Sequence, residues 1–83
     1  MISHRIEETT LCGLFAEVLG VPEIDPNDSF FDLGGHSLSV SKLVRLMRTR
    51  QEIDITMRVV YDNPTPASLA KHINAAETVG AKG

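Results

Sequence analysis

Cysteine, tryptophan and long apolar runs are scarce in this chain of 83 residues. The single cysteine, Cys12, excludes an internal disulfide and suits a reducing compartment. No segment approaches the roughly 20 apolar residues of a membrane-spanning helix. Residues 1–20 also lack the pattern of a secretory signal. We therefore expect a cytoplasmic protein with no membrane partner.

The chain is too short to build a large enzyme cleft. A domain of this size buries only about 60–65% of the surface that its unfolded form exposes, so it can form one thin hydrophobic core. A deep cleft needs walls on several sides, which this length cannot supply. Size therefore favours a binding or carrier module over an enzyme.

Aromatic residues are few and the charges are unevenly placed. The sequence holds one Tyr and three Phe, and its net charge is −3. Residues 1–36 contain seven acidic residues against Arg5, whereas residues 37–83 contain four acidic and seven basic ones. Because the basic residues are dispersed among apolar positions, we expect no nucleic-acid partner. No carboxylate or thiol spacing around His4 and His72 matches a metal site, so no metal is expected.

The first half of the chain predicts one helix followed by a long packed loop. Apolar residues at spacings of three and four predict a helix over about 6–19, and Gly20 is suited to ending it. Residues 20–36 then lose the helical period for longer than a usual connection. This segment still carries the apolar residues Val21, Ile24, Phe30, Phe31 and Leu33. We expect them to hold the loop in order across the helices.

The second half predicts three more helices. Helical spacing recurs over residues 37–50, again briefly over 57–61, and from residue 66 onward. Thr65 can act as the N-cap of the last helix, with Pro66 at its first position. The fold class is therefore all-α, a four-helix bundle with a short third helix and a long packed loop between helices one and two. Residues 1–76 form the domain, and residues 77–83 are expected to be a flexible tail or linker.

The helix over 37–50 has two distinct faces. Its apolar period predicts a core face made of Val40, Leu43, Val44 and Met47. Turning the helix by about 100° per residue places Leu38, Ser41, Lys42, Arg45 and Leu46 mostly on the other side. Two leucines are thus expected near water, flanked by cations.

Ser37 is the candidate functional residue, because it stands where the loop ends and this helix begins. A helix start has unpaired backbone N–H groups and a positive dipole end, so a phosphodiester on the Ser37 oxygen would lie where anions are stabilised. Serine is also a preferred N-cap that needs no further function. The preceding Gly34 and Gly35 permit positive φ and close approach of another molecule. Residue chemistry alone leaves the two interpretations open.

A catalytic serine is not supported. The glycine that should end a G-x-S-x-G elbow is replaced by Ser39, and no strand is expected before Ser37. No acidic residue and histidine follow in the order that such a triad requires. Cys12 is interpreted as a small half-buried helix residue.

The segment FFDLGGHSL, residues 30–38, resembles the attachment motif of peptidyl carrier (thiolation) domains of nonribosomal peptide synthetases. Residues 10–20 resemble the first helix of that family, and residues 61–70 resemble its third-to-fourth helix junction. The resemblance implies that Ser37 is esterified by 4′-phosphopantetheine from coenzyme A, with Gly34, Gly35 and His36 as the flanking motif. The thiol of the arm would then carry aminoacyl or peptidyl thioesters.

The resemblance also implies the partners. These are a phosphopantetheinyl transferase and adenylation, condensation, thioesterase or tailoring domains, which would act on a monomeric, non-catalytic carrier. The docking residues are expected to be Leu38 and Leu46 on the second helix, together with Met57, Arg58 and Val59 on the third. For His36, a contact to the phosphate or the transferase and a purely exposed loop side chain both stay open.

Two alternatives accompany this interpretation. Related carriers for polyketide or fatty-acyl groups usually have Asp before the serine and a more acidic second helix. Here His36 precedes Ser37, and Lys42, Arg45 and Arg48 follow it, which favours a peptidyl carrier over an acyl carrier protein. The other alternative is a helical interaction module in which the glycines and the serine only shape a loop and a cap.

Overall fold

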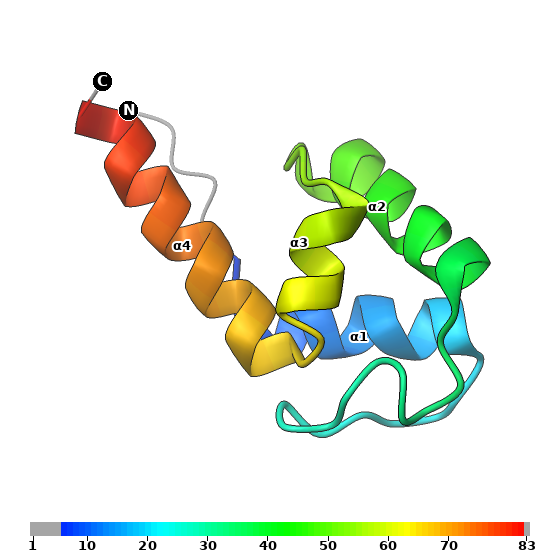
Figure 1. Cartoon of the computed structure of the whole chain (residues 1–83). Helices are drawn as coiled ribbons and strands as arrows, with labels where there is room; N and C mark the ends of the chain where they lie inside the picture. The colour runs from blue at the N-terminus through cyan, green and yellow to red at the C-terminus, as the bar shows by residue number, and fades with distance from the viewer. Residues whose placement is uncertain (1–5, 83) are drawn as a thin grey trace.

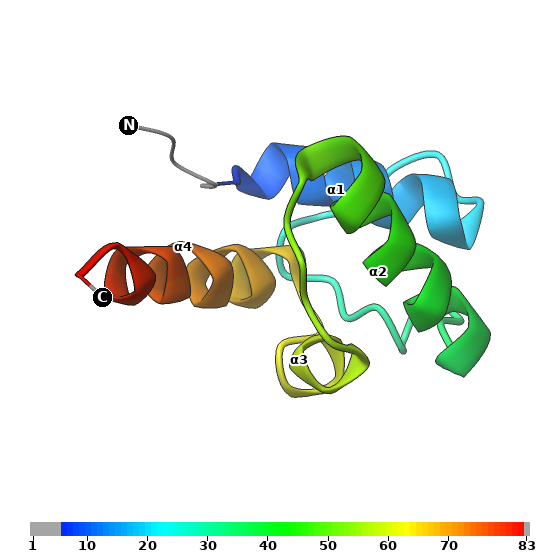
Figure 2. The same cartoon turned by 90° about the horizontal axis from the view of Figure 1, so that it is seen from above.

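The computed structural model describes the backbone of residues 6–82 and the side chains of residues 6–75. Over this range the fold is all-α with no strand, as the sequence predicts. The helices are α1 (Glu8–Leu19), α2 (Ser37–Gln51), α3 (Met57–Asp62) and α4 (Pro66–Lys82). α1 packs against α2 and α4, and α2 packs against α3, while the far end of α4 projects from the body (Figure 1, Figure 2).

The helix ends follow the signals in the sequence. Gly20 ends α1 in the left-handed conformation with φ 71°, which glycine adopts without steric cost. Thr65 precedes α4, and its Oγ1 accepts a hydrogen bond of 3.0 Å from the backbone N–H of Ser68. Thr56 caps the short α3 in the same way, accepting from the N–H of Val59 at 3.3 Å. None of the described helices combines the length and apolar character that a membrane crossing needs.

The long loop between α1 and α2 is fixed to the rest of the fold by two backbone hydrogen bonds. The N–H of Phe30 donates to the carbonyl of Pro64 at 2.8 Å, and the N–H of Ala67 donates to the carbonyl of Pro26 at 2.9 Å. Ile24 and Phe30 are buried. The prediction of an ordered, packed loop is confirmed. One bond ties the loop to the junction of α3 and α4, and the other ties it to the first turn of α4.

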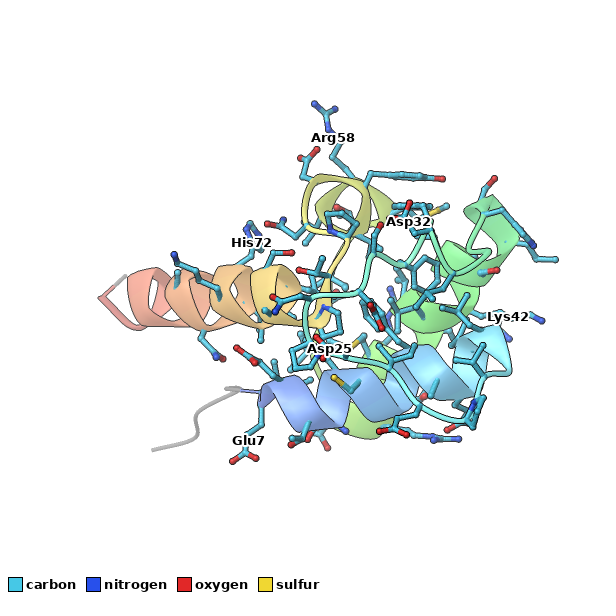
Figure 3. The ribbon with its side chains drawn as sticks, turned by 90° about the horizontal axis from the view of Figure 1, so that it is seen from below. Glu7, Asp25, Asp32, Lys42, Arg58 and His72 are labelled. Atoms are coloured by element: carbon cyan, nitrogen blue, oxygen red, sulfur yellow. The ribbon has the colours of Figure 1, made fainter. Side chains whose placement is uncertain are left out.

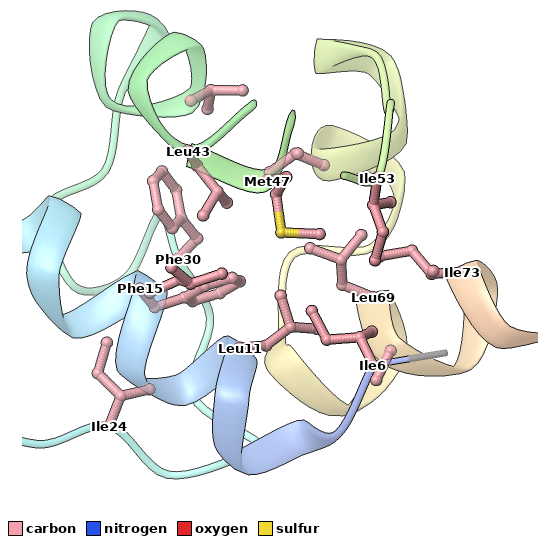
Figure 4. Packing of buried hydrophobic residues seen from close by; sticks show 14 residues of the cluster. Ile6, Leu11, Phe15, Ile24, Phe30, Leu43, Met47, Ile53, Leu69 and Ile73 are labelled. Carbon is pink, nitrogen blue, oxygen red and sulfur yellow. The ribbon is translucent and has the colours of Figure 1, made fainter. Parts of the chain in front are cut away.

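One core unites the loop and the four helices (Figure 4). Its fully buried residues include Leu11, Phe15, Phe30, Val40, Leu43, Met47, Val60 and Leu69. Phe15 and Phe30 meet edge to face, with ring centroids 5.1 Å apart. Burying an aliphatic or aromatic side chain of this kind contributes about 1.5–3 kcal/mol, so these residues supply most of the free energy that holds the bundle together.

Two expectations about the helices need correction. Val44 and Leu46 are both half-buried at the edge of the core, although one was expected inside and the other near water. α4 continues through Lys82, into the segment 77–83 for which a tail was predicted. A helix that is already nucleated adds residues at little further cost, so Gly80 does not end it. The use of this segment as a flexible tail or linker stays a prediction, since the side chains beyond 75 and the whole of residue 83 lie outside the described part.

Candidate functional site

Ser37 is the first residue of α2, and its side chain is exposed to solvent. The N-cap position is occupied by His36, whose backbone is extended and whose side chain makes no capping hydrogen bond. The Ser37 hydroxyl likewise forms no hydrogen bond with any described residue. Ser37 is therefore not the N-cap of α2, and its hydroxyl is free to react.

The start of α2 is suited to an anion. Helical hydrogen bonding begins with the N–H of Val40, which donates to the carbonyl of His36 at 2.9 Å. The amides of Ser37, Leu38 and Ser39 consequently have no acceptor within the helix. The first turn also contains no acidic residue that would repel a negative charge. A phosphate ester on Ser37 would lie at the positive end of the helix dipole, so these residues fit such a group.

The two glycines before this site have different roles. Gly34 has φ 99°, a conformation that other residues rarely adopt, so it makes the turn into α2. Gly35 is needed for packing, because a Cβ there would overlap the Cδ2 atom of Phe30 and lie 2.6 Å from its carbonyl oxygen. The N–H of Gly35 donates to that same carbonyl at 2.9 Å. The expected close approach at Gly35 is thus made by Phe30 of the chain itself.

Replacing Gly35 with alanine should destabilise the domain by about 1–3 kcal/mol, because the new methyl group collides with a fully buried ring and a backbone oxygen. Gly13→Ala is the matched control, since a Cβ at Gly13 meets nothing within 4 Å. In the interior of α1 it should raise the stability by about 0.5–1 kcal/mol. Urea unfolding measures both, and equal effects of the two substitutions would contradict the packing role of Gly35.

The predicted docking residues on α2 and α3 are exposed to different degrees. Leu38 is 62% exposed and Met57 is 36% exposed. Arg58 is also exposed and points away from the body (Figure 3), where it forms a weak ion pair with Asp62. Val59 and Leu46 are half-buried, so they offer a partner less apolar area than Leu38 does. His36 is exposed beside Ser37, which leaves both interpretations of it possible.

Sequence reasoning missed an aromatic pair between α3 and the long loop. Tyr61 of α3 is 45% exposed. Its ring stacks on that of Phe31 in the long loop, with centroids 5.1 Å apart and planes 3° from parallel. Such a pair stabilises by about 0.5–1.5 kcal/mol beyond its buried area. Only the tertiary structure reveals it, because the two residues lie far apart in the sequence.

A second missed feature joins α1 to α2. Arg50 donates two hydrogen bonds of 2.7 Å to the carboxylate of Glu17. This contact lowers the pKa of Glu17, chiefly through the side-chain hydrogen bond. Elsewhere, burial raises the pKa of the half-buried Cys12 thiol, so this thiol is a poor nucleophile. The described residues contain no cluster of His, Cys, Asp and Glu that could hold a metal ion.

Comparison with known proteins agrees with this geometry. The family model for the phosphopantetheine attachment site matches residues 9–73. A dimodular nonribosomal peptide synthase of Bacillus subtilis (strain 168) is 42% identical over 72 residues, which cover 87% of this chain. The chain spans only 3% of the length of that synthase.

Solved structures give the same result for the fold. A non-ribosomal PCP domain superimposes with a TM-score of 0.71 at 35% identity, covering 81% of this chain and 91% of the other. A structure of the phosphopantetheine transferase Sfp in complex with coenzyme A and a peptidyl carrier protein matches with a TM-score of 0.78 at 27% identity, covering 86% and 92%. The chain belongs to the phosphopantetheine attachment site family, and within it to the peptidyl carrier domains of nonribosomal peptide synthetases.

Proposed function

We propose that Ser37 is the residue to which 4′-phosphopantetheine is attached. The observation that carries the proposal is the exposed Ser37 hydroxyl, unbonded to described residues, at the first position of α2. The free amides of the first turn stabilise the negative phosphate. Gly34 lets the chain turn sharply into the helix, and Gly35 lets the turn pack against Phe30. When bound, the group supplies a thiol that can hold a cargo as a thioester.

The rest of the function follows from a rigid bundle that presents a flexible arm. The carrier itself catalyses nothing, and its aminoacyl or peptidyl cargo passes between adenylation, condensation, thioesterase or tailoring domains. Support for a peptidyl cargo comes from the peptide synthetases among the relatives and from the cations Lys42 and Arg45 on α2. Small docking surfaces suit such sequential visits, because the complexes must dissociate quickly.

The test is modification in vitro. The protein is incubated with coenzyme A, magnesium and a broad-specificity phosphopantetheinyl transferase, and its intact mass is measured. We expect one phosphopantetheine per chain, located by fragmentation on the peptide that contains Ser37. A chain that gains no mass would instead be a helical interaction module. Loading the modified chain with an amino acid or with an acyl group then distinguishes a peptidyl carrier from an acyl carrier protein.

Leu38→Asp tests the docking surface. Leu38 is the most exposed large apolar residue in the described part, and a charge there would have to lose its hydration when a partner covers it. Loading by an adenylation domain should slow by about tenfold, while circular dichroism shows an unchanged fold. Lys71→Asp, at an exposed position of α4, serves as the control. Unchanged loading of the Leu38 variant would remove this residue from the interface.

A further inference from the structure

Asn74 of α4 holds the backbone of Ile6, the first residue that the structure describes. The Oδ1 atom of Asn74 accepts a hydrogen bond of 2.9 Å from the N–H of Ile6, and its Nδ2 atom donates one of 3.1 Å to the carbonyl of the same residue. The two residues lie 68 positions apart in the sequence. One side-chain amide thus pairs with both backbone groups of a single residue, as a neighbouring β-strand would. These two hydrogen bonds form the Asn74 clamp.

Ile6 needs these partners because it lies outside α1. Glu7 is the N-cap of that helix, and its backbone is extended with φ −93° and ψ 152°. Helical hydrogen bonding begins with the N–H of Leu11, which donates to the carbonyl of Glu7 at 3.1 Å. The helix itself therefore offers no partner to the N–H and the carbonyl of Ile6. Asn74 supplies both, whereas the side chain of Glu7 makes no capping hydrogen bond.

The side chain of Ile6 strengthens the attachment to α4. It is 4% exposed and belongs to the same core cluster as Leu69 and Ile73 of α4 (Figure 4). Ile6 and Asn74 also line an open groove of about 1100 Å³ between the start of α1 and the first half of α4. Water in this groove can reach the two hydrogen bonds. The contact can therefore open locally while the rest of the core stays folded.

The Asn74 clamp and the proposed attachment residue lie at opposite ends of α1. Ile6 stands just before this helix. At its other end, Val18 shares a groove with Leu38, the neighbour of Ser37. The 12 residues of α1 span about 18 Å, because a helix rises about 1.5 Å per residue. A turn of the bundle about Ile6 therefore moves Ser37 over a distance that the length of α1 sets.

We propose that the Asn74 clamp sets the hinge of this carrier: the rigid body begins at Ile6 rather than at α1, so the bundle turns about Ile6 as one unit. This inference rests on the proposed function, in which the arm on Ser37 visits several domains. With the clamp closed, every reorientation of the bundle is transmitted to Ser37 through α1. With the clamp open, Ile6 and Glu7 absorb part of the motion, and the arm is placed less precisely. Asn74 is thus a positioning residue that acts through Ile6 from the far end of α1.

The hinge is tested by NMR on the unmodified chain, so its failure is distinct from a failure of modification at Ser37. In the original chain the backbone order parameter of Ile6 should be about 0.85, the value of rigid backbone. Asn74→Ala should lower it below about 0.6 and speed hydrogen exchange of the Ile6 amide by at least about tenfold. Leu14, inside α1, should stay rigid and well protected in both chains. Circular dichroism checks that the helices remain.

Two further variants separate the clamp from other effects. Asn63→Ala removes a comparable side-chain hydrogen bond, from Nδ2 to the carbonyl of Val59 at 3.0 Å, and should leave Ile6 ordered. Asn74→Asp keeps an acceptor for the Ile6 N–H but cannot donate to its carbonyl, so the order parameter of Ile6 should lie between those of the original chain and Asn74→Ala. An Ile6 that stays equally rigid in Asn74→Ala, or that loosens equally in Asn63→Ala, would overturn the proposal.

Loading of the arm separates a hinge from a docking surface. The arm-bearing Asn74→Ala variant is loaded by an adenylation domain supplied as a separate protein. We expect kcat and KM to stay within about twofold of the original, because a hinge matters only where carrier and enzyme share one chain. When the same domain precedes the carrier in one chain, loading of the variant should slow by about threefold, since fewer orientations bring Ser37 to the enzyme. Slower loading with separate proteins, or an unchanged rate in the linked chain, would contradict the hinge.

Discussion

Ser37→Ala is expected to abolish the mass gain from phosphopantetheinyl transfer completely. We propose that the ester forms on the side-chain oxygen, and alanine removes that oxygen without disturbing the helix, because the Ser37 hydroxyl bonds to no described residue. Alanine also has the highest helix propensity. The thermal midpoint should therefore stay within a few degrees of the original while the modification is lost. Intact mass and thermal unfolding measure the two effects separately.

Ser41→Ala is the matched control for this experiment. Ser41 is also exposed on α2 and lies one turn beyond Ser37, on nearly the same side of the helix. It lacks the free amides of the first turn, so it offers no stabilisation to a phosphate. We expect the Ser41 variant to be modified at the original rate. Retained modification of the Ser37 variant, with loss in the Ser41 variant, would move the attachment point one turn along α2.

The positions of the helices along the sequence could be predicted because local chemistry dictates them. The spacing of the apolar residues in α2 marks the face of the helix that turns toward the core. Val40, Leu43 and Met47 on this face are indeed fully buried. Thr65 favours the start of a helix because its side chain can accept a hydrogen bond from the first turn. Gly20 favours the end of a helix because its backbone adopts the left-handed conformation. None of these features needs knowledge of a distant residue.

Features that depend on distant contacts could not be predicted in the same way. The edge position of Leu46 is set by where α1 crosses α2, and the ion pair of Glu17 with Arg50 joins residues 33 positions apart. The true role of Gly35 depends on the fold of the loop, which brings Phe30 back against it. The capping position of His36 was missed because Ser37 has the stronger statistical preference for it. At this position the geometry of the turn, rather than the residue's own preference, decides which residue is the N-cap.

The residues of the proposed attachment site could be recognised in the sequence, but the contacts that support them could not. Ser37 and its two glycines stand together in the sequence, so their chemistry is visible there. What holds them in place comes from elsewhere: the Phe30 carbonyl accepts from Gly35, and the Phe30 N–H donates to Pro64. Phe30 therefore connects the turn before Ser37 with the junction of α3 and α4. Its ring extends the connection to α1 through Phe15.

Phe30→Ala should lower the free energy of unfolding by about 3–5 kcal/mol, the usual cost of removing a fully buried aromatic ring. A domain of 83 residues has about 4–12 kcal/mol in total. The substitution thus removes a large share of the stability. The backbone hydrogen bonds of residue 30 remain possible, but the cavity lies against Gly35, so the turn before Ser37 loses the surface on which it rests. Urea unfolding at 10 °C measures the loss.

Phe31→Ala is the neighbouring control. Phe31 is half-buried and stacks on Tyr61 near the surface, so its loss should be closer to the about 0.5–1.5 kcal/mol of an aromatic pair. Under conditions where both variants are folded, phosphopantetheinyl transfer should be slower for the Phe30 variant than for the Phe31 variant. When the turn before Ser37 is poorly held, the Ser37 hydroxyl reaches the transferase in the correct position less often. The KM of the transferase for the carrier should therefore rise more than its kcat falls. Equal stabilities and equal transfer rates in the two variants would show that Phe30 does not support the site.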